Sequence, residues 1–135
     1  MGTTWLSGRG RCPLKGAVIA AGLLAGALSA SGAWAHAYLV KAIPAQRAVV
    51  FAPPARVVLW FNERLEPRFC TMTVADAAGK SVDRGDPQVP GDNPKQLTVG
   101  LQPLTPGVYT VQFRVLSVDS HVVADQFTFK VAAGR

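Results

Sequence analysis

Hydrophobic and polar residues alternate in short runs over the C-terminal part of the chain. In the stretch "QFTFKV", Phe127, Phe129 and Val131 alternate with Thr128 and Lys130. Successive side chains of a strand point to opposite faces, so a period of two predicts a strand with one buried face. The same alternation is present in residues 97–101 and 109–115. These three segments are therefore predicted to be strands.

Three further hydrophobic segments have the length of strands and are bounded by breakers. They are residues 38–43, 56–62 and 69–75. No segment after residue 36 carries apolar residues at helical spacing over three turns. Six or seven short strands separated by turns are typical of an antiparallel β-sandwich. The predicted fold class is therefore all-β.

Three side chains within these segments carry a more local prediction. Tyr109 follows a Pro-Gly turn in "LTPGVYTV", an arrangement that resembles the tyrosine corner of Greek-key sandwiches. A plain hairpin entry with a half-buried tyrosine explains the same sequence equally well. Trp60 of "VVLWF" is expected in the core as an aromatic residue, and Cys70 is expected to be a small buried hydrophobe.

The first 35 residues are predicted to be a signal peptide. Three basic residues precede an uncharged stretch, residues 16–35, which is rich in Ala and Gly and ends in Ala33-Trp34-Ala35. A basic start, an apolar middle and a small-x-small end mark a cleavable secretory leader. A retained membrane anchor is the alternative, since an uncharged stretch of this length can span a bilayer. Cleavage after Ala35 leaves one domain, residues 36–135.

Removal of this leader changes what charge and cysteine content imply. Three of the 14 Lys and Arg residues lie in the leader, so 11 remain against eight Asp and Glu, and the formal charge falls from +6 to +3. The remaining basic residues are scattered, which argues against a nucleic-acid-binding surface. Cys12 also lies in the leader, so Cys70 has no cysteine left with which to form an internal disulfide.

Two histidines carry the candidate chemistry of the chain. His121 follows Asp119 by two residues, and in an extended segment such side chains lie on one face, about 6.5 Å apart along the strand. After cleavage, His36 would carry a free α-amine beside its imidazole, and both nitrogens can chelate a metal. Three nitrogens and one oxygen suit Cu(II) better than Zn(II), Ca(II) or Mg(II). Met72 and Cys70 alone would give Cu(I) little support.

Four segments of the domain indicate a relationship to a protein family. They are "AHAYLVKAIPA", "VVLWFNERLEP", "VADAAGKSV" and "LTPGVYTVQFRVLSVDSHVVADQFTFKV". Together they resemble the CopC family of periplasmic copper-binding proteins over residues 36–131. The resemblance implies an immunoglobulin-like Greek-key β-sandwich of cupredoxin-like topology that binds Cu(II) through His36, Asp119 and His121. Glu63 of "FNERLEP" matches a family glutamate near the same site.

The sequence also departs from the family pattern. Ala124 and Asp125 stand where the family more often has a glycine followed by an apolar or aromatic residue. The Met-rich loop of members with a second, Cu(I) site is absent, so the chain resembles a Cu(II)-only member. Glu63 is expected either beside the metal or, as an ordinary surface carboxylate, in an ion pair with Arg64 or Arg68.

The resemblance implies a non-enzymatic copper carrier or buffer in the periplasm. Such a protein would be a monomer that exchanges copper with an inner-membrane copper transporter and binds no nucleic acid. A copper-dependent monooxygenase with a histidine brace is an alternative, although an equatorial Asp119 would leave little room for oxygen. A metal-free immunoglobulin-like adhesion or assembly module is a third hypothesis. It explains the strands but neither His36 nor His121.

Overall fold

The computed structural model describes residues 37–134, and the predicted signal peptide lies outside this range. The described residues form seven strands and one short 3-10 helix. Their bounds are β1 Leu39–Ile43, β2 Val49–Val50, β3 Arg56–Phe61, η1 Pro67–Phe69, β4 Thr71–Ala75, β5 Gln96–Gly100, β6 Gly107–Leu116 and β7 Val122–Val131. All six predicted strands are present. Within the described range, no helix is long and apolar enough to cross a membrane.

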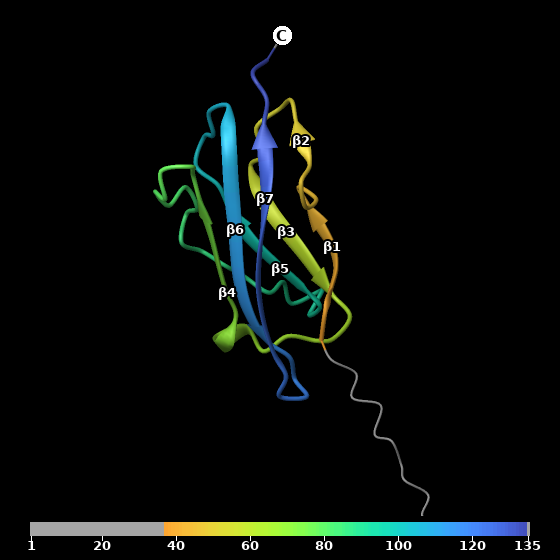
Figure 1. The fold of residues 1–135 in the computed structure, drawn as a ribbon. Helices are drawn as coiled ribbons and strands as arrows, with labels where there is room; N and C mark the ends of the chain where they lie inside the picture. The colour runs from red at the N-terminus through yellow and green to blue at the C-terminus, as the bar shows by residue number, and fades with distance from the viewer. Residues whose placement is uncertain (1–36, 135) are drawn as a thin grey trace, which may run out of the picture. The chain divides into compact units, whose positions relative to one another are not determined.

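The strands form two sheets that pack face to face as a β-sandwich (Figure 1). One sheet has the order β1-β3-β5 and the other the order β2-β7-β6-β4. The connections β4–β5 and β5–β6 each cross from one sheet to the other, as in Greek-key sandwiches. This confirms the predicted fold class.

Strand β2 departs from the predicted antiparallel arrangement. It pairs with β7 in parallel, through Val49 with Lys130 and Val50 with Val131. All other strand pairs are antiparallel. Strand β1 belongs to the three-stranded sheet, and the chain then reaches the edge of the other sheet, where it forms β2. A strand of two residues carries too little alternation to be predicted from sequence.

The core lies between the two sheets and is built from the inward positions of the alternating segments. Val57, Leu59 and Phe61 point inward from β3, and Phe127, Phe129 and Val131 do so from β7. The rings of Phe61 and Phe113 meet edge to face with centroids 5.6 Å apart. Burial of each large apolar side chain stabilises the fold by about 1.5–3 kcal/mol. The sandwich therefore depends on its core and on no disulfide among the described residues.

Tyr109 forms the tyrosine corner that its sequence context suggested. Its hydroxyl donates a hydrogen bond of 2.5 Å to the carbonyl of Thr105, four residues upstream. Its ring is buried and stacks on Phe129 at 5.5 Å. The bond fixes the loop that leads into β6, so the interpretation of Tyr109 as a plain hairpin residue is wrong.

Trp60 lies outside the core, contrary to expectation. Its neighbours Leu59 and Phe61 are buried, whereas Trp60 is half-buried on the outer face of the three-stranded sheet. The ammonium of Lys41 lies 5.0 Å from the centre of its ring. Trp60 faces outward because side chains alternate along β3. Its neighbour Phe61 faces inward, and two adjacent residues of a strand cannot both do so.

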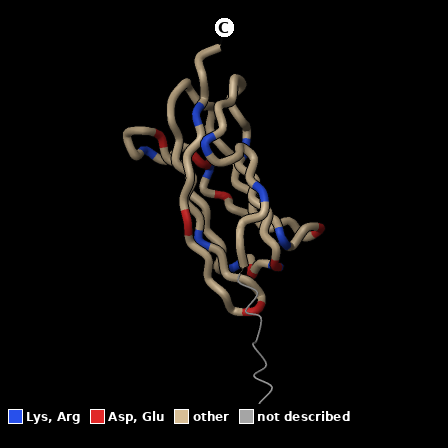
Figure 2. The backbone as a smooth tube through the Cα atoms, turned by 45° about the vertical axis from the view of Figure 1, so that its right-hand side comes forward, with Lys and Arg blue, Asp and Glu red and all other residues tan. Residues whose placement is uncertain are grey.

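Basic and acidic residues are interspersed along the described backbone (Figure 2). No large region carries one sign of charge in this view. This distribution agrees with the scattered charge pattern predicted from the sequence.

Candidate metal site

The loop between β6 and β7 holds the two candidate ligands that the structure describes. The strands pair continuously over ten rows, from Gly107 with Val131 to Leu116 with Val122, and leave residues 117–121 at the tip. The N–H of Ser120 donates to the carbonyl of Ser117 at 2.9 Å, and the N–H of Ser117 donates to the carbonyl of His121 at 2.9 Å. Ser120 has a φ of 73°. The bond between Ser117 and His121 therefore closes a loop of three residues, 118–120, whose last residue is left-handed. This is a common three-residue hairpin connection.

Asp119 and His121 therefore do not lie in an extended segment, and the expected pleat geometry was wrong. The turn brings them closer instead: Oδ2 of Asp119 lies 3.0 Å from Nδ1 of His121. The side chain of His121 is 26% exposed and that of Asp119 is 38% exposed. Both side chains are accessible to a metal ion from solvent.

Ser117 organises this loop and was not identified from the sequence. It is 1% exposed, and its hydroxyl donates to Oδ1 of Asp119 and accepts from the N–H of His121 at 3.2 Å. The hydroxyl of Ser117, and next the imidazole of His121, lower the pKa of the Asp119 carboxyl. The signal in the sequence was the spacing S-x-D-x-H directly after a strand.

The pairing of Asp119 with His121 also selects a ring nitrogen. A metal bound while Nδ1 faces the carboxylate must be bound through Nε2, because each imidazole nitrogen has one lone pair or one proton to offer. A carboxylate on the opposite ring nitrogen fixes the orientation of the imidazole and increases its basicity. Rotation of Asp119 would instead add its oxygen to the metal. The loop can thus offer a nitrogen ligand alone or a nitrogen and an oxygen together.

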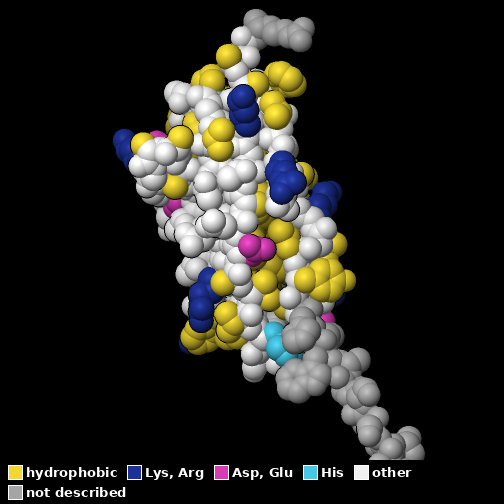
Figure 3. Space-filling view, viewed as in Figure 1, with side chains coloured by type: hydrophobic (Ala, Val, Ile, Leu, Met, Phe, Trp, Pro, Cys, Tyr) yellow, Lys and Arg dark blue, Asp and Glu magenta, His cyan; other side chains and the backbone are white. Residues whose placement is uncertain are grey.

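The third predicted ligand, His36, lies outside the described residues. The residues that follow it are well fixed: Ala37 is 5% exposed, and the N–H of Tyr38 donates to Oδ1 of Asn62 at 2.6 Å. The described chain begins at the same end of the sandwich as the tip of the β6–β7 hairpin (Figure 1). Histidine is visible on the surface at this end (Figure 3).

Glu63 is not brought into a cluster with Asp119 and His121. Among residues 37–134, no group of three or more His, Cys, Asp or Glu side chains could hold a metal ion. The described range also contains no ion pair between Glu63 and Arg64 or Arg68. Glu63 is half-buried in the segment after β3, and its role as a ligand or neighbour of the metal stays a prediction.

The two sulfur side chains face the core. Met72 is 2% exposed and Cys70 is 7% exposed, which confirms the expected burial of the cysteine. Burial raises the pKa of the Cys70 thiol, whose S–H donates to the carbonyl of Glu66 at 3.2 Å. Neither sulfur is presented to solvent as a Cu(I) ligand would need to be.

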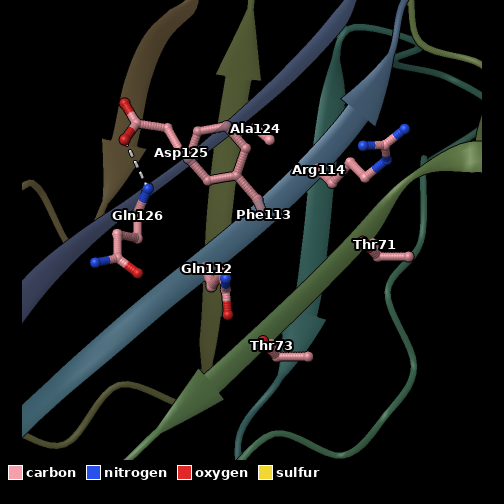
Figure 4. A pocket seen from close by; sticks show the side chains of 8 residues that line it. All are labelled: Thr71, Thr73, Gln112, Phe113, Arg114, Ala124, Asp125 and Gln126. Carbon is pink, nitrogen blue, oxygen red and sulfur yellow. Dashed lines mark hydrogen bonds between the residues drawn. The ribbon is translucent and has the colours of Figure 1, made fainter.

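A hollow of about 480 Å³ lies elsewhere, on the outer face of the four-stranded sheet (Figure 4). Its lining comes from β4, β6 and β7 and comprises Thr71, Thr73, Gln112, Phe113, Arg114, Ala124, Asp125 and Gln126. Asp119 and His121 do not line it. Ala124 and Asp125 pair regularly with Arg114 and Phe113, so the departure from the family pattern does not interrupt β7.

The fold and the loop define a small β-sandwich domain with nitrogen and oxygen donors at one end. The chain belongs to the CopC family, whose CopC domain matches residues 39–132. A crystal structure of CopC from Methylosinus trichosporium OB3b has a TM-score of 0.65 and 35% identity, and covers 74% of this chain and 97% of that chain. This agreement confirms the resemblance found in the sequence.

Curated relatives extend the comparison. Protein YobA of Escherichia coli K12 is 34% identical over 110 residues, which is 81% of this chain and 89% of that protein. Copper resistance protein C of Pseudomonas syringae pv. tomato is 33% identical, over 84% of this chain and 91% of that protein. Copper transport protein CutJ of Bacillus subtilis 168 is 32% identical over 73% of this chain, but the match covers only 18% of CutJ.

Proposed function

We propose that this protein is a periplasmic Cu(II)-binding carrier or buffer of copper homeostasis or resistance. In this proposal, cleavage after Ala35 exposes His36, whose α-amine and imidazole bind one Cu(II) together with His121 and Asp119. The observation that carries the proposal is the pairing of Asp119 and His121, 3.0 Å apart, at the tip of the β6–β7 hairpin. The start of β1 lies at the same end of the sandwich (Figure 1).

The chemistry of the donors supports copper. Imidazole, amine and carboxylate groups favour Cu(II) among the divalent ions of the first transition row, and Cu(II) prefers a tetragonal arrangement that such a set can supply. Two relatives of the chain are named a copper resistance protein and a copper transport protein. Asp119 can act as the oxygen ligand or can orient His121, and Glu63 is proposed to lie beside the metal.

A carrier role without catalysis follows from the same donor set. With Asp119 rotated onto the metal, four ligands from the protein would fill the equatorial plane of Cu(II) and leave little room for oxygen. The match to less than a fifth of CutJ supports an association of this type of domain with a larger copper transport protein. We therefore propose that the chain is monomeric and exchanges copper with a membrane transporter.

The test is a titration of the protein that begins at His36 with Cu(II), followed by an assay of ascorbate and oxygen consumption. Uptake of one Cu(II) without turnover is the expected result. Uptake with sustained oxygen consumption would favour a monooxygenase. Absence of uptake would favour a metal-free adhesion or assembly module. Mass spectrometry of the exported protein tests the cleavage itself, and an N-terminus other than His36 would contradict the proposed chelate.

A further inference from the structure

The residue Asn62 connects the start of the described chain with the segment that supports the candidate metal loop. It directly follows β3. Its Oδ1 accepts the N–H of Tyr38 at 2.6 Å, and its own N–H donates to the carbonyl of Tyr38 at 3.2 Å. The two bonds extend the pairing of β1 with β3 beyond Leu39, where the strand ladder ends. The backbone two residues after His36 is thus held by the side chain and the backbone N–H of one residue, Asn62.

Asn62 is itself held in place from the opposite side. Its carbonyl accepts a hydrogen bond of 3.0 Å from the ammonium of Lys95. The N–H of Phe61, one residue earlier, donates to the carbonyl of Lys95 at 2.9 Å. An anchor positions another group well only when its own orientation is fixed. These contacts fix the backbone from which the Asn62 side chain extends to Tyr38.

The segment that follows Asn62 reaches the hairpin tip. The N–H of Val118 donates to the carbonyl of Arg64 at 2.9 Å, and Leu65 forms a β-bridge with Ser117. Residues 62–65 therefore contact the start of β1 at one end and the loop of Asp119 and His121 at the other. Two residues of extended chain span at most about 7 Å. Both His36 and Asp119 lie within two residues of these contacts.

We infer that Asn62 is a positioning residue of the copper site. It does not bind the metal; its side chain holds Ala37 and Tyr38 so that the amine and imidazole of His36 meet Asp119 and His121. The inference rests on the proposed function, because it concerns the same ion. A residue that is distant in sequence from the N-terminus would thus align the N-terminus with the hairpin loop.

The test compares three variants of the protein that begins at His36. Asn62→Ala removes the acceptor of the Tyr38 N–H, and Asn62→Asp keeps an oxygen at the same position. Asp76→Ala is the matched control, because the Asp76 carboxylate also accepts loop N–H groups, those of Ala78 and Lys80, but forms no hydrogen bond with Tyr38 or Lys95 among the described residues. Cu(II) affinity, the electron paramagnetic resonance spectrum of bound Cu(II) and the thermal midpoint are measured for each.

Asn62→Ala is expected to weaken Cu(II) binding about 10–100-fold, as is usual for residues that orient metal ligands. Its spectrum should also change, which a purely structural loss of stability would not cause. Asn62→Asp and Asp76→Ala should keep the wild-type affinity and spectrum. Wild-type affinity and spectrum in Asn62→Ala would overturn the inference, and so would an equal loss in Asn62→Asp.

A double-mutant comparison separates this inference from the proposed function. In a protein with one extra residue before His36, the free amine of the chelate is absent and only the His36 imidazole remains to be positioned, so Asn62→Ala should cause a smaller loss of copper affinity than in the processed protein. Equal losses in the extended and the correctly processed proteins would contradict the role assigned to Asn62. Absence of Cu(II) binding by the wild-type protein would instead refute the proposed function.

Discussion

Oδ2 of Asp119 lies 3.0 Å from Nδ1 of His121, at the tip of a hairpin whose strands pair over ten rows. The two side chains meet because a turn with a left-handed Ser120 reverses the chain between them. The strands supply rigidity and the turn supplies proximity. A preformed pair of this kind lowers the ordering cost of binding a metal.

Substitution of the loop ligands should separate binding from folding. Asp119→Ala and His121→Ala are expected to weaken Cu(II) binding by orders of magnitude and to leave the sandwich folded, because both side chains are partly exposed. Tyr109→Ala should instead destabilise the fold by about 3–5 kcal/mol through loss of a buried aromatic ring. Calorimetric titration and urea unfolding measure the two effects. Unfolding of His121→Ala would identify His121 as a structural residue.

Ser117→Ala should weaken copper binding although Ser117 itself is buried. The substitution removes the hydroxyl that holds Oδ1 of Asp119 and accepts the N–H of His121. Loss of such an orienting contact typically reduces metal affinity 10–100-fold. Ser120→Ala is the control, because it keeps a Cβ at the same left-handed position and alters no described contact of Asp119. Equal affinities of the two variants, measured by competition with a Cu(II) chelator, would argue against this role.

Retention of one extra residue before His36 should leave a folded protein that binds Cu(II) much more weakly. A peptide nitrogen is planar and conjugated and is a poor metal donor, whereas a terminal amine, with a reference pKa of about 7.7–8.0, loses its proton readily. His36→Ala keeps the amine and removes the imidazole, so it probes the other half of the chelate. Affinity equal to that of the processed protein would show that the terminus takes no part in binding.

The processed protein should retain Cu(II) in competition with an equal concentration of Zn(II). Nitrogen and oxygen ligands bind Cu(II) more tightly than Zn(II) in the general order of divalent metal affinities, and a tetragonal set adds to this preference. Metal analysis after equilibrium dialysis against both ions gives the ratio. Similar occupancies of the two metals would count against the proposed ligand set.

Asp83 should make the apo-protein sensitive to acid. Burial acts to raise the pKa of Asp83, but hydrogen bonds from the N–H of Val74, the hydroxyl of Ser81 and the N–H of Gly85 together lower it. A lowered pKa in the folded state stabilises the fold above the unfolded value of about 3.9 and loses this effect as pH falls through the folded pKa.

Asp83→Asn should therefore reduce the free energy of unfolding at pH 7 by about 1–3 kcal/mol, since buried donors lose a charged acceptor. The difference from wild type should shrink as pH falls below about 4, where the unfolded carboxyl takes up a proton, and then through the lowered folded pKa of Asp83. Asp92→Asn, at an exposed position, is the control. Urea unfolding of both variants at several pH values checks this, and a difference that stays constant with pH would contradict it.

The strands were predictable from sequence because alternation directly reflects which side of a strand is buried. Phe127, Phe129 and Val131 show this clearly. Strand β2 and the outward position of Trp60 were missed: the former is too short to alternate, and the latter depends on its neighbour Phe61 facing inward. The prediction of an extended segment at Asp119 and His121 was wrong, because Ser120 between them adopts a positive φ and forms a turn. Such a φ favours glycine, so a serine gave no sign of it.

The role of Asn62 depends on contacts that spacing does not reveal, whereas Ser117 is the first residue of the S-x-D-x-H spacing and its contacts with Asp119 and His121 depend on the loop conformation. Ser117 acts through a loop conformation, and Asn62 contacts a residue 24 positions away in sequence. Polar residues at strand ends are common and usually solvated, so Asn62 did not stand out beside the histidines, and Ser117 was noted only as part of the S-x-D-x-H segment. Their hydrogen-bond partners became apparent only when the fold placed β1, β3 and the β6–β7 hairpin at one end.

Strand β1 belongs to the three-stranded sheet and the β6–β7 hairpin to the four-stranded sheet. An ion held by His36 and His121 would therefore cross-link the two layers at one open end of the sandwich. Ligands that bind only the folded state stabilise it by about 2.7 kcal/mol at a hundredfold excess over the dissociation constant. The empty protein would separate its layers more often at that end and would be cleaved faster by proteases. If the proposed copper site forms, the lifetime of the protein would then depend on whether copper is bound.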